Sequence, residues 1–302
     1  MHSKSKGIVF MILASGIFGF TPILARLSFE GGANGITMVF LRAVISLPLL
    51  ALIIKIKKIP FKIPGDLVKQ MLICGIFASL TAILLYSSFN YIDVGLAVTI
   101  HFINPALVVL ASALFFREKM QAHKWVALAL VMTGVLLLME AVTRTGPTGI
   151  VLAFLSGVSL AAYILALGRS DLHRLHYLTI TFYLCVMVSI GSLVFGLASG
   201  HLTFALTPMA WFYAFLISVL VSIFAVTFFQ LGVIKAGPST ASLVSCLEPI
   251  TGIAFGVIIL SEILTPLRAL GGALIIISVA VISIAGRSKD YTSSTQEGSQ
   301  RK

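Results

Sequence analysis

Apolar stretches of about 20 residues recur along the chain and alternate with short polar connections. A stretch of this length crosses a hydrocarbon core of roughly 30 Å as an α-helix. Helices satisfy their own backbone hydrogen bonds in lipid, so the pattern predicts an all-α membrane protein with ten transmembrane helices. The predicted spans are approximately residues 7–26, 34–54, 69–91, 94–116, 123–141, 147–168, 176–198, 209–234, 237–260 and 265–286.

Polar and proline positions of the fourth and ninth spans repeat at a constant offset of 144 residues. Two copies of a five-span unit are therefore predicted, residues 1–144 and 145–287, followed by a tail at 288–302. An odd number of spans delivers the second copy to the membrane upside down, so the two five-helix repeats are inverted, a plan typical of secondary transporters. The equivalent pairs are His101 and Ser245, Asn104 and Glu248, Pro105 and Pro249, and Glu118 and Glu262.

Composition agrees with this interpretation. The chain has 302 residues, of which 59% are hydrophobic and only 10% charged, and its mean hydropathy is +1.08. A soluble core of that size would leave too little polar surface. The tail at 288–302 is rich in Ser, Thr and Gln and has no apolar periodicity, so it is predicted to be disordered.

The net charge of +11 would suggest a nucleic-acid partner in a soluble protein, but here it is a topology signal. With the N-terminus in the cytoplasm, 17 of the 21 Lys and Arg residues fall in cytoplasmic connections or tails. The asymmetry predicts both termini inside and no nucleic-acid partner.

The sequence contains no common motif for binding a cofactor or a metal ion. The three cysteines, Cys74, Cys185 and Cys246, lie inside apolar spans without metal-like spacing, so they are interpreted as reduced packing residues. No phosphate-binding loop and no zinc-protease or nucleophile-elbow motif is present. We therefore expect no metal, no cofactor and no ATP hydrolysis by this chain.

Pro105 and Pro249 stand near the middle of their spans. Each removes one backbone donor and clashes with the carbonyl four residues earlier, which frees the carbonyls of His101 and Ser245. In lipid, such groups must be satisfied by protein or lie against a water-filled cavity. A simple helix kink is the alternative, but the repetition favours a pair of helix-breaking positions that line a cavity.

Glu248 is the most informative side chain. A carboxylate at the centre of a span costs about 2.5–3.5 kcal/mol on insertion scales, so it is expected to face the bundle interior or water. Ala241, Ser245, Glu248 and Gly252 form a small or polar stripe at helical spacing. The hypothesis is that Glu248 binds a substrate ammonium group or takes part in proton coupling. The alternative is a structural carboxylate held by neighbouring helices.

Further polar and aromatic side chains complete the candidate pathway. His101 and Asn104 share one helix face, and Arg42 is the only basic residue within a span, interpreted as a possible structural charge. The remaining candidates are also explained by ordinary helix packing. They are Tyr86 with its repeat equivalent Gln230, together with Phe18, Thr21 and Tyr163.

The two five-span halves, the Glu248-Pro249 pair, and Leu260-Ser261-Glu262 followed by Thr265-Pro266 and a Gly-rich helix resemble the EamA branch of the drug/metabolite transporter superfamily. The resemblance covers about residues 7–287. Phe18-Gly19 stands where many relatives have Trp-Gly, and Asn104 replaces a glutamate. The resemblance implies a ten-helix bundle, a central cavity, alternating access and export of amino acids or related metabolites across a bacterial inner membrane.

The leading functional hypothesis is a secondary active exporter of a small metabolite, with the proton as a possible coupling ion. A membrane-embedded enzyme acting on a lipid-linked substrate through His101 and Glu248 is the main alternative, and a signalling or scaffold protein is a third. The sequence does not specify the substrate, the direction of transport, the coupling ion or the oligomeric state.

Overall fold

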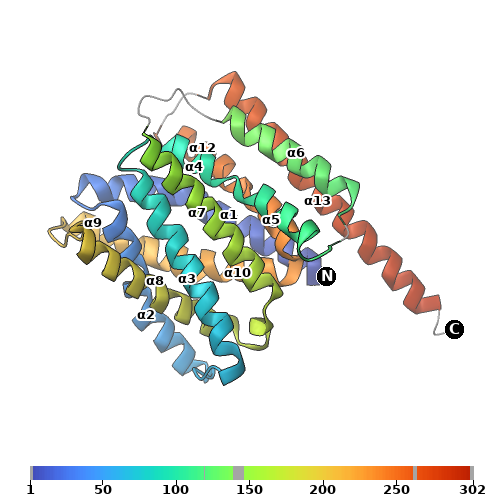
Figure 1. Ribbon diagram of the computed structural model, residues 1–302, viewed down its shortest axis with the longest axis horizontal. Helices are drawn as coiled ribbons and strands as arrows, with labels where there is room; N and C mark the ends of the chain where they lie inside the picture. The colour runs from blue at the N-terminus through green and yellow to red at the C-terminus, as the bar shows by residue number, and fades with distance from the viewer. Residues whose placement is uncertain (1–2, 119, 139–145, 261–263, 300–302) are drawn as a thin grey trace.

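The computed structural model is a bundle of α-helices (Figure 1) and describes residues 3–118, 120–138, 146–260 and 264–299. The helices of the first repeat are α1 (Ser3–Glu30), α2 (Gly35–Ile56), α3 (Gly65–Ser88), α4 (Val94–His101), α5 (Asn104–Leu114) and α6 (Ala122–Leu137). Those of the second are α7 (Pro147–Arg169), the 3-10 turn η1 (Asp171–Arg174), α8 (Tyr177–Ser199), α9 (Pro208–Ile217), the π-helical η2 (Ser218–Ala225), α10 (Val226–Ala236), α11 (Pro238–Ser245), α12 (Leu247–Leu260) and α13 (Pro266–Ser299).

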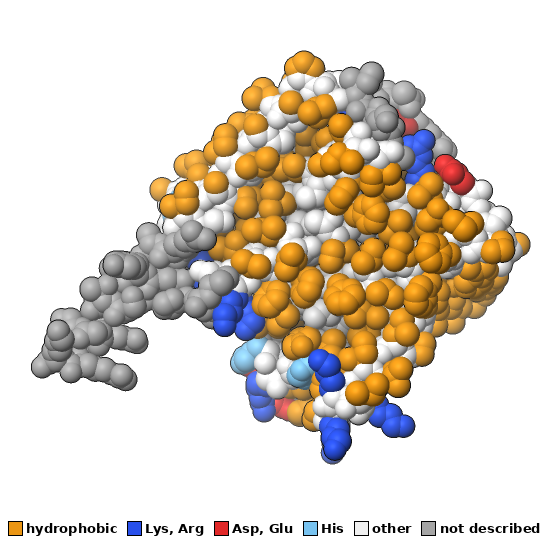
Figure 2. Space-filling view, turned by 180° about the vertical axis from the view of Figure 1, so that it is seen from behind, with side chains coloured by type: hydrophobic (Ala, Val, Ile, Leu, Met, Phe, Trp, Pro, Cys, Tyr) orange, Lys and Arg blue, Asp and Glu red, His pale blue; other side chains and the backbone are white. Residues whose placement is uncertain are grey.

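The described helices account for the ten predicted spans. Nine helical segments are long and apolar enough to cross a membrane, and α6 is a shorter apolar helix that makes the tenth. Hydrophobic side chains cover most of the face seen in Figure 2, while Lys and Arg gather mainly along its lower edge. This is the distribution expected of an apolar belt in the bilayer with charged connections outside it. The chain is therefore an all-α membrane protein with ten transmembrane helices.

The two halves correspond closely. Helices α4 and α11 contain eight residues each, and both ends of α11 lie 144 residues after those of α4. Helix packing is also symmetric between the repeats. Helix α1 packs on α10, and its equivalent α7 packs on α3, the equivalent of α10. Helix α2 packs on its own equivalent α8, and α6 packs on its own equivalent α13. Symmetric packing of this kind is what two inverted five-helix repeats produce.

Connections that carry most of the basic residues lie on one face of the bundle, because they contact one another. The segment that joins α2 to α3, with the first turn of α3, contacts α8 and η1. The end of α7 contacts the segment after α5. The start of α1 packs against the end of α10. These contacts are Thr179 to the Pro60 carbonyl at 3.0 Å, Arg174 to Asp66 at 2.9 Å, Arg169 to Glu118 at 3.2 Å, and Gly7 against Ala236.

Two features concern the predicted domain boundaries. The boundary between residues 144 and 145 lies outside the described residues. Helix α13 continues to Ser299, into the tail at 288–302 for which the composition predicts disorder, and in Figure 1 its last part projects beyond the bundle.

Candidate functional site

The fourth and ninth spans are broken next to their prolines. Helix α4 ends at His101 and α5 begins at Asn104, with Pro105 in the first turn of α5, where its missing N–H costs no helical hydrogen bond. Similarly, α11 ends at Ser245 and Pro249 falls in the first turn of α12. Both prolines therefore begin a new half-helix near the middle of the membrane.

Side chains satisfy the two carbonyls that these breaks leave free. The Asn104 Nδ2 donates to the His101 carbonyl at 3.1 Å, and the Ser15 hydroxyl donates to the Ser245 carbonyl at 3.5 Å. Protein side chains therefore supply the hydrogen bond that each carbonyl loses because of the proline.

Repeat-equivalent residues make equivalent contacts at the breaks. Ser15 of α1 and Ser156 of α7 hold equivalent places, and Ser156 lies 2.8 Å from His101 Nδ1. The Ser156 hydroxyl donates to the Ala153 carbonyl at 2.6 Å, so it accepts from His101. Nδ1 of His101 therefore carries the proton. The first helix of each repeat therefore contacts the broken helix of the other repeat.

Glu248 lies at the start of α12 among groups from other helices. Arg42 of α2 and Glu248 both interact electrostatically with the hydroxyl of Tyr86 on α3. Within the described residues, neither Arg42 nor Glu248 has a side-chain hydrogen bond or an ion pair, although the two charges are opposite. Glu248 and Tyr86 are deep in the bundle and nevertheless retain intermediate exposure.

An aromatic cluster is formed by residues of α1, α7 and α10. The rings of Tyr163 from α7 and Phe229 from α10 stack with centroids 6.1 Å apart, and Phe18 from α1 meets Phe229 edge-on at 6.2 Å. Offset and edge-on ring contacts give such a cluster a defined geometry.

Gln230 belongs to a buried polar chain between α8 and α10. Its Nε2 donates to the Thr181 hydroxyl at 3.2 Å, and Thr227 lies 2.8 Å from the same hydroxyl. The Oε1 of Gln230 is buried without a hydrogen-bond partner among the described residues. An amide oxygen left in this state is free to accept a bond from a ligand or water.

Some predicted site residues are not joined to Glu248. His101 and Asn104 lie at the α4–α5 break against α7, and no described hydrogen bond, ion pair or electrostatic interaction connects either with Glu248. The Thr21 hydroxyl bonds to the Ile17 carbonyl of its own helix at 3.0 Å, and the Ser245 hydroxyl to Ser242 at 2.8 Å. Asn104 Oδ1 is buried and has no hydrogen-bond partner in the part of the chain that the structure describes.

Sequence reasoning did not single out two residues that contact the predicted ones, Phe229 and Thr181. Neither has a distinguishing sequence signal, although Phe229 precedes Gln230 directly. For Arg42 the sequence left open a structural role or pairing with a carboxylate, and among the described residues Arg42 forms no ion pair. Among the described residues, no three metal-binding side chains lie together.

The chain matches the EamA-like transporter family over residues 5–140 and 147–284. It belongs to that family. Its sequence is similar to an uncharacterized transporter of Synechocystis sp., with 22% identity over 92% of this chain and 93% of the relative. It is also similar to Protein RarD of Streptomyces exfoliatus, with 26% identity over 93% and 89% of the two chains. One solved crystal structure shares the fold, with a TM-score of 0.79 and 15% identity over 94% of this chain and 99% of that one.

A charged cluster on Glu118 links α6, α7 and α11 on the face that carries the basic connections. Glu118 accepts from Lys124 of α6, from Arg169 of α7 at 3.2 Å and from Ser239 of α11 at 3.1 Å. Burial alone would raise the pKa of Glu118, but the bond and charge of Lys124, the hydroxyl of Ser239 and the guanidinium of Arg169 outweigh it and lower the pKa. The cluster ties both repeats together at one end of the bundle.

Glu118→Gln is expected to lower the free energy of unfolding by about 1–2 kcal/mol, because two cations lose their shared, partly buried carboxylate. Asp66→Asn is the matched control, because the ion pair of Asp66 with Arg174 is exposed on both sides and worth about 0–1 kcal/mol. Thermal unfolding in detergent measures both variants at neutral pH.

The stabilisation by Glu118 is expected to depend on pH. Because the folded pKa of Glu118 is lowered from 4.5, its contribution is complete above that pH and is lost as the pH falls through the lowered value. The difference in unfolding temperature between wild type and Glu118→Gln should therefore shrink in acid below pH 4.5. A difference that grows in acid would contradict the assignment.

Proposed function

We propose that this protein is a secondary active transporter that exports amino acids or related zwitterionic metabolites by alternating access. One observation carries the proposal: Glu248 of α12 and Arg42 of α2 lie within spans, near enough to Tyr86 of α3 for their charges to act on it, and neither has a hydrogen bond or ion pair among the described residues. Unpaired charges inside a membrane protein are costly and mark substrate or ion pathways. A solute that carries an amine and a carboxylate would match both charges.

Each group has a role in this scheme. Glu248 receives the ammonium group of the substrate at the N-terminal end of α12. Arg42 receives the carboxylate, since its planar fork suits bidentate pairing. Tyr86 lies near enough to both for their charges to act on it, and the Phe18, Tyr163 and Phe229 rings offer an apolar surface to the side chain of the substrate.

The fold supports alternating access around this site. Inverted repeats of this kind move against each other about a binding site near the midplane, often at discontinuous helices. The breaks at α4–α5 and α11–α12 supply such discontinuities, and the Glu118 cluster would have to open in one of the two states. His101 and Asn104 line the equivalent break of the first repeat and are proposed as pathway residues at that level.

The proposed setting is a bacterial inner membrane with both termini in the cytoplasm. It rests on the common face of the basic connections, because short loops rich in Lys and Arg remain on the cytoplasmic side. A proton gradient is the proposed energy source, with Glu248 as the residue that exchanges the coupling proton.

Counterflow into proteoliposomes tests the function with a panel of radiolabelled amino acids. A transported amino acid is then compared with its decarboxylated amine in wild type and in Arg42→Gln. We expect Arg42→Gln to reduce uptake of the amino acid about 10- to 100-fold, and to reduce uptake of the amine far less, since the lost charge-assisted contacts are worth about 1.5–3 kcal/mol. Equal losses for both solutes would refute the assignment of Arg42 to the substrate carboxylate.

The alternative of a membrane enzyme is tested by the same preparation. An enzyme acting through His101 and Glu248 would turn over its lipid-linked substrate in detergent, where no compartments exist. A transporter produces only flux between compartments. Catalytic turnover in detergent that depends on Glu248 would favour the enzyme, and gradient-driven accumulation would favour the transporter.

A further inference from the structure

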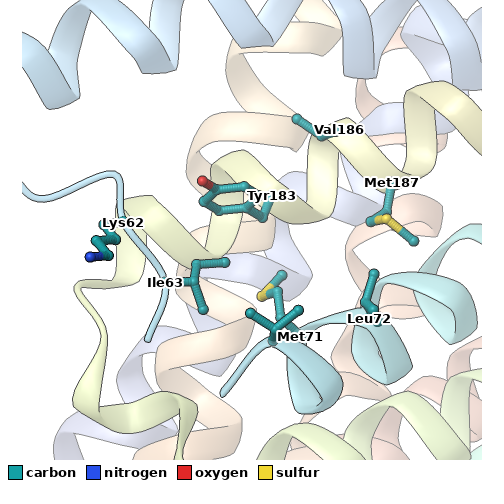
Figure 3. A pocket seen from close by; sticks show the side chains of 8 residues that line it. Lys62, Ile63, Met71, Leu72, Tyr183, Val186 and Met187 are labelled. Carbon is teal, nitrogen blue, oxygen red and sulfur yellow. The ribbon is translucent and has the colours of Figure 1, made fainter. Parts of the chain in front are cut away.

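An apolar groove opens between α3 and α8 next to the connection that joins α2 to α3 (Figure 3). Its volume is about 340 Å³. Lys62 and Ile63 of the connection lie at one end, and Leu72 and Met187 lie at the other. The groove therefore begins at a charged membrane surface and leads into the apolar belt.

The two helices leave an opening at this end and approach closely farther along. Gly75 allows close contact farther along α3, because a Cβ there would lie 2.5 Å from the Met187 side chain. Leu72 and Val68, one and two turns earlier, are 46% and 41% exposed and line the opening. From Val68 to Gly75 the helix rises by about 10 Å.

Hydrogen bonds hold the mouth of the groove in place. Tyr183 of α8 donates its hydroxyl to the Phe61 carbonyl at 3.0 Å, and Thr179 donates to the Pro60 carbonyl at 3.0 Å. In Figure 3 the Tyr183 hydroxyl is turned toward the Lys62 end. The segment that carries Lys62 is therefore attached to α8, while the groove wall on the other side belongs to α3.

The charge at the mouth is positive. Lys62 has no acidic partner among the described residues, and the nearby Asp66 is engaged by Arg174 at 2.9 Å. Lys57, Lys58 and Lys69 lie on the same connection or at the start of α3. Burial and the ammonium of Lys57 lower the pKa of His176, so this histidine remains neutral at neutral pH. The connection from Lys57 to Pro64 thus offers an anionic group several cations and contains no Asp or Glu.

We propose that this groove binds one anionic phospholipid from the adjacent leaflet, with an acyl chain between α3 and α8 and the phosphate beside Lys62. A groove that opens on the bilayer at apolar residues suits an acyl chain, and the basic connection selects an anionic headgroup. Helix α3 belongs to the first repeat and α8 to the second, so the lipid contacts both repeats.

Native mass spectrometry of the purified full-length chain tests the site with phosphatidylglycerol and phosphatidylcholine of identical acyl chains. We expect one phosphatidylglycerol to be retained about fivefold better than phosphatidylcholine. Lys62→Gln should remove this preference, and Leu72→Trp should fill the groove and reduce retention of both lipids about fivefold or more.

Matched variants separate the groove from general surface effects. Lys58→Gln removes a neighbouring charge outside the groove, and Ile76→Trp enlarges an exposed α3 residue that is absent from the lining, so both should retain the lipid as wild type does. Val68→Trp replaces Leu72→Trp if that variant unfolds. Any of three results would overturn the proposal, whatever the transport assays show. The two lipids could be retained equally, Lys58→Gln and Lys62→Gln could lose the lipid equally, or neither groove-filling variant could have an effect.

Discussion

Glu248→Gln is expected to reduce transport about 100-fold or more while the protein inserts and folds as well as wild type. Transport falls because a charge-assisted contact to the substrate amine, worth about 3 kcal/mol, is lost. Folding is preserved because Glu248 has no side-chain hydrogen bond or ion pair in the described structure, so no internal contact is removed. Glutamine also avoids the cost of placing a charge within a span.

Two measurements on one preparation test this expectation. Counterflow reports the transport rate, and thermal unfolding in detergent reports stability. Glu118→Gln is the matched control, since it makes the same chemical change at a carboxylate with three described partners and should lose stability. Wild-type flux in Glu248→Gln, or unfolding of Glu248→Gln at a clearly lower temperature, would refute the role assigned to Glu248.

Gly19→Val is expected to destabilise the protein by about 3 kcal/mol or more, because α1 and α12 touch at this residue. A Cβ on Gly19 would overlap the Thr251 hydroxyl and lie 2.5 Å from the Glu248 carbonyl and 2.7 Å from the Gly252 nitrogen. Two of these three atoms belong to the backbone, which cannot rotate away as a side chain can. Helix α12 must shift, and Glu248 shifts with it.

Gly16→Val provides the control on the same helix, since nothing lies within 4 Å of its added Cβ. Its unfolding temperature should remain close to that of wild type, because only the small helix-propensity difference applies. Size-exclusion chromatography and thermal unfolding compare the two variants. Equal behaviour of Gly16→Val and Gly19→Val would show that α1 and α12 do not meet at Gly19.

The span pattern and the repeat could be predicted from the sequence because both depend on local properties. Hydrocarbon thickness sets the length of an apolar helix. Proline removes a backbone donor wherever it stands, so the breaks before Pro105 and Pro249 follow from two residues alone. The offset of 144 residues also predicts that α4 and α11 correspond, and their ends do.

The site depended on contacts that local patterns do not contain. Arg42 and Tyr86 lie 206 and 162 residues before Glu248, and only the packing of the helices brings both charged side chains near Tyr86. No described hydrogen bond, ion pair or electrostatic interaction joins His101 to Glu248, although equivalent positions in the two repeats suggested one shared site. Periodicity gives the face of a helix and not the identity of its neighbour.

The sequence by itself determined that this protein is a membrane bundle of ten helices in two inverted repeats, because apolar length, basic asymmetry and an odd span count need no tertiary contact. The tertiary structure alone decided which polar side chains come near one another: Arg42 and Glu248 near Tyr86, Glu118 with three partners, and Lys62 at the mouth of a groove. The physical reason is that lipid imposes the same demand on every span, whereas each helix crossing depends on the shapes of two particular surfaces.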